Sequence, residues 1–203
     1  MLRVILLYCA YSFLNDCGLK WAVSWGEVES INYNLLSLFT AVEYSLFTMV
    51  IYFNLHNINL KKILRIASAI FLLFSLFHFL RNAAGRMDSI VITIELIMLI
   101  IFCLFYFFEE INQPNSTFIY STYNFWIIVG ILIYATGTFF FFMQSNDFSD
   151  EEWNRWSPIN YVFTILKNIF FCIALIIQKS ETPKKSIRSK MDDIFDKPLN
   201  PYN

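Results

Sequence analysis

The sequence has little charge, little glycine and little proline, and each shortage excludes a class of protein. Only 15% of the 203 residues are charged, whereas a soluble domain carries about 25%. Five glycines and five prolines are too few for a collagen-like or low-complexity chain. Sixteen acidic against fifteen basic residues give a net charge of −1, which excludes a broad basic face. We therefore expect neither a soluble domain nor a nucleic-acid partner.

Motifs of soluble enzymes and metal sites are also missing. The sequence contains no Cys-x-x-Cys, His-Glu-x-x-His or Gly-x-Ser-x-Gly motif and no phosphate-binding glycine loop. The two histidines, His56 and His78, are too few for an ordinary His-based metal site. All four cysteines fall in apolar segments, which argues against a disulfide framework. We expect no metal, no cofactor and no enzymatic activity.

Apolar and aromatic residues, in contrast, are abundant. Hydrophobic residues make up 57% of the chain, 23 of them are phenylalanine, and the mean hydropathy is +0.52. A membrane-spanning helix needs about 20 mostly apolar residues. The sequence therefore predicts an all-α, polytopic membrane helix bundle with six transmembrane helices, occupying residues 1–180. The predicted spans are 4–22, 34–54, 63–80, 90–108, 125–143 and 159–178.

The first apolar segment has two interpretations. Arg3 precedes an apolar run of about eleven residues, as in a secretory signal. No cleavage site follows cleanly, and Trp21 and Trp25 suit an anchor at the membrane–water interface. We favour a retained span, with a signal sequence as the alternative.

The basic residues predict the orientation, because cytoplasmic loops carry an excess of Lys and Arg. With six spans and the N-terminus inside, ten of the fifteen bases lie on the inner side and four on the outer side. This predicts an N-in/C-in protein of the inner (plasma) membrane of a bacterium, with residues 181–203 in the cytoplasm. That tail is first basic and then acidic. It is either a solvated segment that enforces orientation or a docking peptide for a cytoplasmic protein.

Ionisable residues inside the spans are the main candidates for function. Each costs about 2.5–3.5 kcal/mol at helix mid-depth, so such residues usually face the bundle interior and pair. There are four such residues, and helix rise places them in the outer half or at the midplane of the membrane: Asp16, Glu43, Glu95 and Lys167. We expect Lys167 to pair with Glu43, with Glu95 as second partner or competitor. The predicted buried polar cluster, opening toward the outer face, comprises Asp16, Glu43, Glu95, Thr136, Lys167 and Asn168.

Two roles are open for this cluster. It is either a hydrogen-bonded ion pair that fixes helix register or a site for a ligand, ion or proton. A second feature is the uncharged span 125–143, where Gly130 and Gly137 lie seven residues apart on one face. Because small residues allow close helix approach, this span is expected to form the packing spine of the bundle.

Three stretches carry a resemblance to known proteins. They are Ala41-Val42-Glu43-Tyr44-Ser45-Leu46, the run from Phe125 to Tyr134, and Asn160 through Ile169. With them the chain resembles, over nearly its whole length, a group of small, uncharacterised multi-pass bacterial membrane proteins. The resemblance implies a similar topology and no particular activity.

The sequence thus favours a membrane sensor, scaffold or partner subunit without catalytic motifs. The alternative is an ion- or proton-coupled transporter or a channel subunit that uses Glu43, Glu95 and Lys167. The expected partners are the lipid bilayer, a cytoplasmic protein at the tail and further copies of the chain.

Overall fold

The computed structural model describes residues 2–24, 29–81, 89–112, 119–144 and 148–195, and these ranges contain helices and no strand. The all-α prediction is confirmed, and each of the six predicted segments lies within one helix. The elements are α1 (Leu2–Ser24), α2 (Glu29–Asn54), α3 (Ile58–Arg81), α4 (Ser89–Ile111), the 3₁₀ turn η1 (Ile119–Ser121), α5 (Tyr123–Gln144), α6 (Asp150–Trp156) and α7 (Pro158–Phe195).

Several of these helices can cross a membrane by length and composition. Among the described residues, four stretches qualify: Ile58–Arg81, Ser89–Ile111, Tyr123–Gln144 and Glu151–Gln178. A shorter apolar helix covers Val4–Asn15. Large apolar side chains on their outer faces are strongly exposed, among them Leu80 at 72% and Ile176 at 71%. Lipid tails cover a surface of this kind, whereas soluble monomers rarely expose one.

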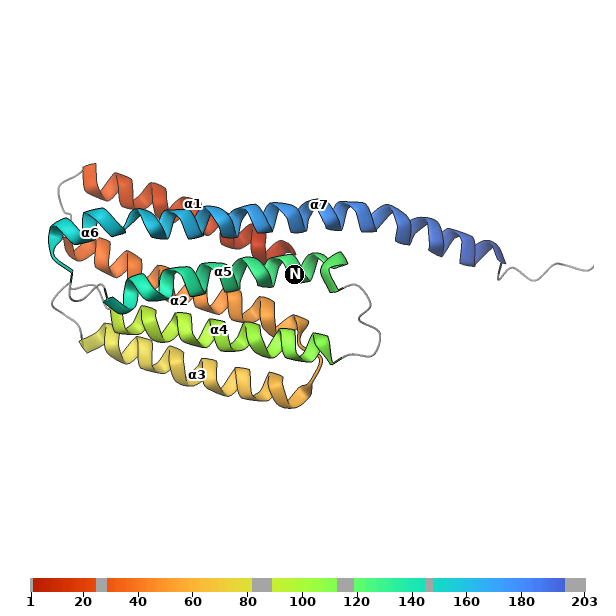
Figure 1. Cartoon of the computed structure of the whole chain (residues 1–203), viewed down its shortest axis with the longest axis horizontal. Helices are drawn as coiled ribbons and strands as arrows, with labels where there is room; N and C mark the ends of the chain where they lie inside the picture. Colours follow the sequence, from red (N-terminus) through yellow and green to blue (C-terminus); the bar gives the residue numbers. More distant parts are fainter. Residues whose placement is uncertain (1, 25–28, 82–88, 113–118, 145–147, 196–203) are drawn as a thin grey trace, which may run out of the picture.

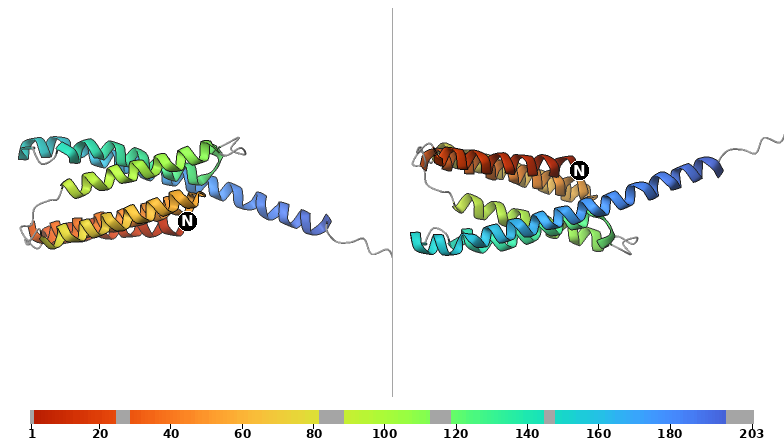
Figure 2. Two further views of the ribbon diagram at one scale, coloured as in Figure 1. Left: turned by 90° about the horizontal axis from the view of Figure 1, so that it is seen from below. Right: turned by 90° about the horizontal axis from the view of Figure 1, so that it is seen from above.

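The long helices form two groups that are inclined to one another (Figure 2). The first group is α1, α2 and α3, and the second is α4, α5 and α7 (Figures 1 and 2). Packing of α2 against α4 joins the two groups. The C-terminal part of α7 extends past the ends of the other helices (Figure 1). The predicted tail is therefore helical as far as Phe195.

The closest packing in the second group is between α5 and α7, and glycine makes it possible. A Cβ atom added at Gly130 would lie 2.9 Å from Phe170 Cβ and 3.3 Å from the carbonyl oxygen of Lys167. One added at Gly137 would lie 2.2 Å from the ring of Phe163. The prediction that these two glycines form a packing surface is confirmed, and the partner helix is α7.

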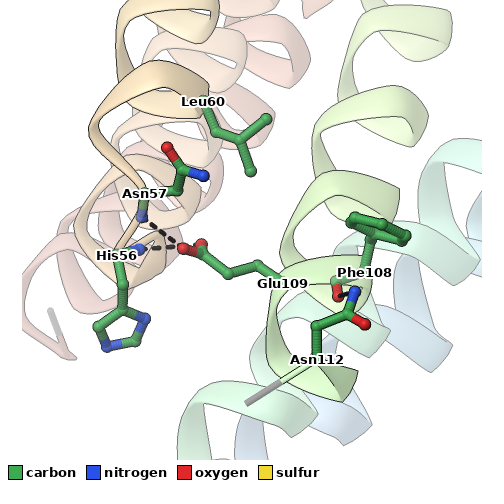
Figure 3. Close-up of a pocket in the computed structure, with 6 residues that line it drawn as sticks. All are labelled: His56, Asn57, Leu60, Phe108, Glu109 and Asn112. Carbon is green, nitrogen blue, oxygen red and sulfur yellow. Dashed lines mark hydrogen bonds between the residues drawn. The ribbon is translucent and has the colours of Figure 1, made fainter.

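A side chain of α4 holds the turn between α2 and α3 (Figure 3). The carboxylate of Glu109 accepts a hydrogen bond of 2.9 Å from the backbone N–H of His56 and a second from that of Asn57. Asn57 Oδ1 in turn accepts from the N–H of Asn59 at 2.8 Å. A carboxylate at the start of α3 offsets the positive end of the helix dipole. Glu109 therefore anchors the first turn of α3 to the end of α4.

Candidate functional site

A cluster of four polar side chains lies between the two groups of helices, with one member from each of four helices. Tyr8 comes from α1, Glu43 from α2, Tyr134 from α5 and Lys167 from α7. We call these four residues the charge cluster. Glu43 and Tyr8 belong to the first group, and Lys167 and Tyr134 to the second. The cluster thus connects helices that otherwise pack mainly within their own group.

Its centre is the ion pair between Lys167 and Glu43. Lys167 Nζ lies 3.2 Å from Glu43 Oε1, and the same Nζ also donates a hydrogen bond to the hydroxyl of Tyr8. The Tyr8 hydroxyl donates a hydrogen bond to Glu43 Oε1 at 2.7 Å, and the Tyr134 hydroxyl donates one to Glu43 Oε2 at 3.1 Å. Both carboxylate oxygens and the ammonium therefore have partners, as a buried ion pair requires.

Helix periodicity brings these groups to one place. On α7, Lys167, Phe171 and Ala174 recur at helical spacing and are 1%, 3% and 1% exposed. They form a buried face of α7, and Gly130 of α5 lets the carbonyl oxygen of Lys167 approach closely. On α2, Glu43 is followed one turn later by the buried Phe47. The small residue at position 130 thus helps to place the ammonium between the two groups.

Aromatic rings surround the ammonium. Lys167 Nζ lies 3.7 Å from the ring centroid of Tyr134, 4.7 Å from that of Tyr8 and 5.2 Å from that of Phe47. We call these three rings the aromatic cage. Cation–π attraction to a desolvated ammonium contributes about 2 kcal/mol in favourable cases. The cage encloses the ion pair, so that the Lys167 side chain is 1% and the Glu43 side chain 6% exposed. Among the described residues the charge cluster is thus enclosed, and the predicted opening toward the outer face is not seen in that part of the chain.

A second buried carboxylate adjoins the charge cluster. Glu95 of α4 is 3% exposed, and its Oε1 has no hydrogen-bond partner among the residues that the structure describes. It is close enough to Glu43 and Lys167 for their charges to interact. Among the side chains that the structure describes, two acids thus lie near one ammonium, and Glu43 is the one paired with it.

Some of the residues predicted for the polar cluster lie at the charge cluster, and others do not. The expected contact between Lys167 and Glu43 is present, with Glu95 beside it. Thr136 instead donates within its own helix to the carbonyl oxygens of Leu132 and Ile133 at 2.7 and 3.2 Å.

Of the two remaining predicted members, Asn168 falls outside the charge cluster, and the structure leaves the side chain of Asp16 undescribed. Asn168 is on the exposed side of α7, because one residue along a helix turns the side chain by about 100° away from the buried face of Lys167. Asp16 belongs to α1, but its side chain lies outside the described residues.

Sequence reasoning missed the tyrosines. Tyr8 and Tyr134 supply half of the charge cluster and two of the three cage rings. A signal for them was available, since a tyrosine buried in an apolar span needs a partner for its hydroxyl. Listing the tyrosines of the apolar spans beside the acids would have included both as candidates, without separating them from the other span tyrosines.

A scan against protein-family models and searches of curated proteins and of solved structures found no match to this chain. Within the described ranges, no three His, Cys, Asp or Glu side chains come together as metal ligands would. The site is thus interpreted from its own chemistry, which is that of an internal ion pair.

Proposed function

We propose that this protein is a non-catalytic membrane sensor or partner protein in which the charge cluster holds the helix bundle in one of two arrangements. The observation that supports this most directly is the Lys167–Glu43 pair, which joins the two groups of helices and is enclosed. Removing one partner of a buried ion pair strongly destabilises the fold, because the other charge is left buried and unpaired. A signal that separates the groups therefore has to break or replace this ion pair as well as loosen the packing of α2 against α4.

Glu95 is the residue that makes a second arrangement accessible. Because an ammonium inside a membrane needs an anionic partner, Lys167 can leave Glu43 at low cost only where another carboxylate accepts it. Glu95 is buried, adjacent, and has an oxygen without a hydrogen-bond partner in the described structure. We take exchange of Lys167 between Glu43 and Glu95 as the switching event.

The output of the switch is carried by α7. This helix holds Lys167 and continues without a break to Phe195, past the end of the bundle (Figure 1). A shift or rotation of α7 at Lys167 therefore moves its C-terminal end. We propose that this end binds a cytoplasmic protein, and that further copies of the chain associate through the bundle.

The proposal includes the topology predicted from the sequence. In it, α1, α2, α3, α4, α5 and the first part of α7 span the inner membrane of a bacterium six times, with both termini in the cytoplasm. The four apolar stretches that qualify by length support a multi-pass arrangement. The basic residues at the start of α3 and beyond Gln178 support the inward orientation of those ends.

A distance measurement between the groups tests the switch. Spin labels at Leu73→Cys on α3 and Ile176→Cys on α7, both exposed positions, would be read by pulsed EPR after the native cysteines are replaced. Glu43→Gln should shift or broaden the distance distribution, because the pair that joins the groups is lost. Glu151→Gln, an exposed acid outside the cluster, is the matched control. An unchanged distribution in Glu43→Gln would contradict the proposal.

Transport is the second candidate function, and the partner-free oxygen of Glu95 favours it. A buried carboxylate beside an exchangeable ion pair can take up a proton or a cation. Proteoliposomes that show proton or cation flux, lost in Glu95→Gln and kept in Glu151→Gln, would support this reading. Absence of flux together with the EPR shift would support the sensor.

A further inference from the structure

The exterior surface of the bundle carries a groove between α2 and α3, separate from the charge cluster. Its volume is about 480 Å³, and most of its lining is apolar, with Met49 of α2 and Ala69 and Leu72 of α3 as members. Met49 is 43% and Leu72 37% exposed, so the groove faces the surroundings of the bundle. In a helix bundle with an apolar exterior, those surroundings are lipid chains.

Most of the polar groups behind the groove have hydrogen-bond partners, and the exception among the described lining residues is the buried Thr48 Oγ1, which has none. The Tyr44 hydroxyl, on a fully buried side chain, donates to Ser68 Oγ at 3.0 Å, and the Ser45 hydroxyl donates to the Ala41 carbonyl at 2.7 Å. A guest along these walls therefore meets mainly apolar surface, with the hydroxyl of Thr48 as the one unpaired polar group among the described lining residues. A single hydroxyl cannot pair the many N–H and C=O groups of a peptide backbone, so such walls suit a hydrocarbon chain better.

Positive charge gathers at one end of the groove. Arg65 lines it, and Arg65 Nη2 donates to the Tyr52 hydroxyl at 2.7 Å. The guanidinium and Lys61 Nζ lie 5.5 and 5.3 Å from the Tyr52 ring centroid. Neither cation forms an ion pair within the described part of the chain. Two unneutralised cations and a tyrosine thus stand at the end of an apolar groove.

The charged end is also held in place. Glu109 anchors the turn that precedes α3 (Figure 3), so Lys61 and Arg65 extend from a fixed first and second turn. From Lys61 to Leu72 the helix rises about 16 Å. This distance accommodates a phosphate at the charged end and much of one acyl chain along the groove.

We propose that this groove binds one anionic glycerophospholipid, with its phosphate at Arg65 and Lys61 and an acyl chain along Met49, Ala69 and Leu72. A zwitterionic lipid is a poorer guest because its own cation repels the two basic side chains. The guanidinium recognises phosphate through paired N–H groups, and the hydroxyl of Tyr52 adds a polar contact beside it. The inference requires a bundle embedded in lipid, and it holds whether the charge cluster acts as a sensor or in transport.

Native mass spectrometry of the full chain in detergent tests the proposal directly. Phosphatidylglycerol or phosphatidylcholine is titrated, and the fraction of protein with one bound lipid is measured. The unaltered chain should bind phosphatidylglycerol more tightly. Arg65→Gln should weaken that binding about fivefold, since a cation near an anionic headgroup contributes about 1 kcal/mol. Lys62→Gln removes the same charge from an exposed neighbour that does not line the groove, and should have little effect.

A second pair of variants tests the groove itself without changing charge. Ala69→Trp fills it, whereas Ile70→Trp adds the same ring at an exposed position that is not part of the lining. Loss of the bound lipid in Ala69→Trp alone supports the proposal, and melting without added lipid reports whether each variant is folded.

Three results would overturn the lipid site. Equal weakening by Lys62→Gln and Arg65→Gln would indicate diffuse attraction, and undiminished binding in Ala69→Trp would place the lipid elsewhere. A dimer in the unaltered chain that becomes a monomer in Ala69→Trp would assign the groove to a second copy.

Discussion

At the scale of single side chains, the ammonium of Lys167 decides how this bundle is held together. A cation inside an apolar bundle is tolerated where a carboxylate, a hydroxyl and aromatic rings replace its water. Lys167 has all three, from Glu43, Tyr8 and the aromatic cage. The pair therefore favours the packing of these helices against one another. Loss of one partner is expected to destabilise the fold more than replacement of both partners by apolar groups.

A double-variant cycle measures this asymmetry. Lys167→Met leaves Glu43 buried without its cation and should lower the free energy of unfolding by about 3–5 kcal/mol. Adding Glu43→Leu to it should restore much of the loss, because no unpaired charge remains. Melting in detergent reads out each variant, with the exposed Asn168→Ala as the neutral neighbour. A double variant less stable than either single one would show that the pair is not acting as a unit.

Removing one hydroxyl tests the bridge between Lys167 and Glu43. Tyr8→Phe keeps the ring in the cage and loses the hydrogen bonds to both charged partners. A hydrogen bond to a charged group contributes about 1.5–3 kcal/mol, so we expect a loss in that range on thermal unfolding. Tyr11→Phe, on the same helix and stacked on Phe39 at 5.7 Å, should melt within a degree or two of the unaltered protein. Equal effects of the two changes would exclude the bridge.

At the scale of helices, the α5–α7 contact controls where the charge is placed. Gly130 leaves room for the backbone of α7, and Gly137 leaves room for the ring of Phe163. The two neighbours differ in their freedom to move. The ring of Phe163 can turn, whereas the Lys167 carbonyl can move only with α7 itself. Position 130 is thus the more sensitive of the two for the geometry of the ion pair.

An added methyl group tests this packing. Gly130→Ala would place its Cβ 2.9 Å from Phe170 Cβ, which is closer than unstrained atoms approach. We expect a loss of about 1–3 kcal/mol on unfolding, as is usual for overpacked cores. Gly18→Ala, in α1 with nothing within 4 Å of the added atom, is the control and should be neutral or slightly stabilising. Equal stability of the two variants would contradict the close approach.

At the scale of the whole molecule, the Lys167–Glu43 ion pair joins two inclined groups of helices, and the long helix α7 of the second group leaves the bundle (Figures 1 and 2). This arrangement can connect a change between the groups to a change at the end of α7. The side of the membrane on which the end of α7 lies depends on the topology proposed above, and a labelling experiment tests that topology.

Cysteine labelling tests that topology. After the native cysteines are replaced, Glu151→Cys should react with a membrane-impermeant maleimide in intact cells, because it follows α5 on the predicted outer side. Lys62→Cys, near the start of α3, should react only after the membrane is permeabilised. The opposite pattern would reverse the orientation, and labelling of both sites in intact cells would remove the inner assignment of α3.

By itself the sequence determined the helices and the need of Lys167 for an anionic partner. Apolar runs of about 20 residues specify helices through hydrogen bonding and burial along the segment, which is local information. The cost of a lone ammonium in lipid likewise predicts a carboxylate partner for Lys167, and Glu43 is that partner.

Only the tertiary structure decided which neighbours share that site. The hydroxyls of Tyr8 and Tyr134 reach Glu43 from helices 35 and 91 residues away in the chain, and no local pattern encodes such distances. The azimuth of each helix also directs Asn168 outward and keeps Thr136 on its own backbone. Packing at Gly130 favours these rotations, because α5 and α7 approach closely where the small residue faces the partner helix.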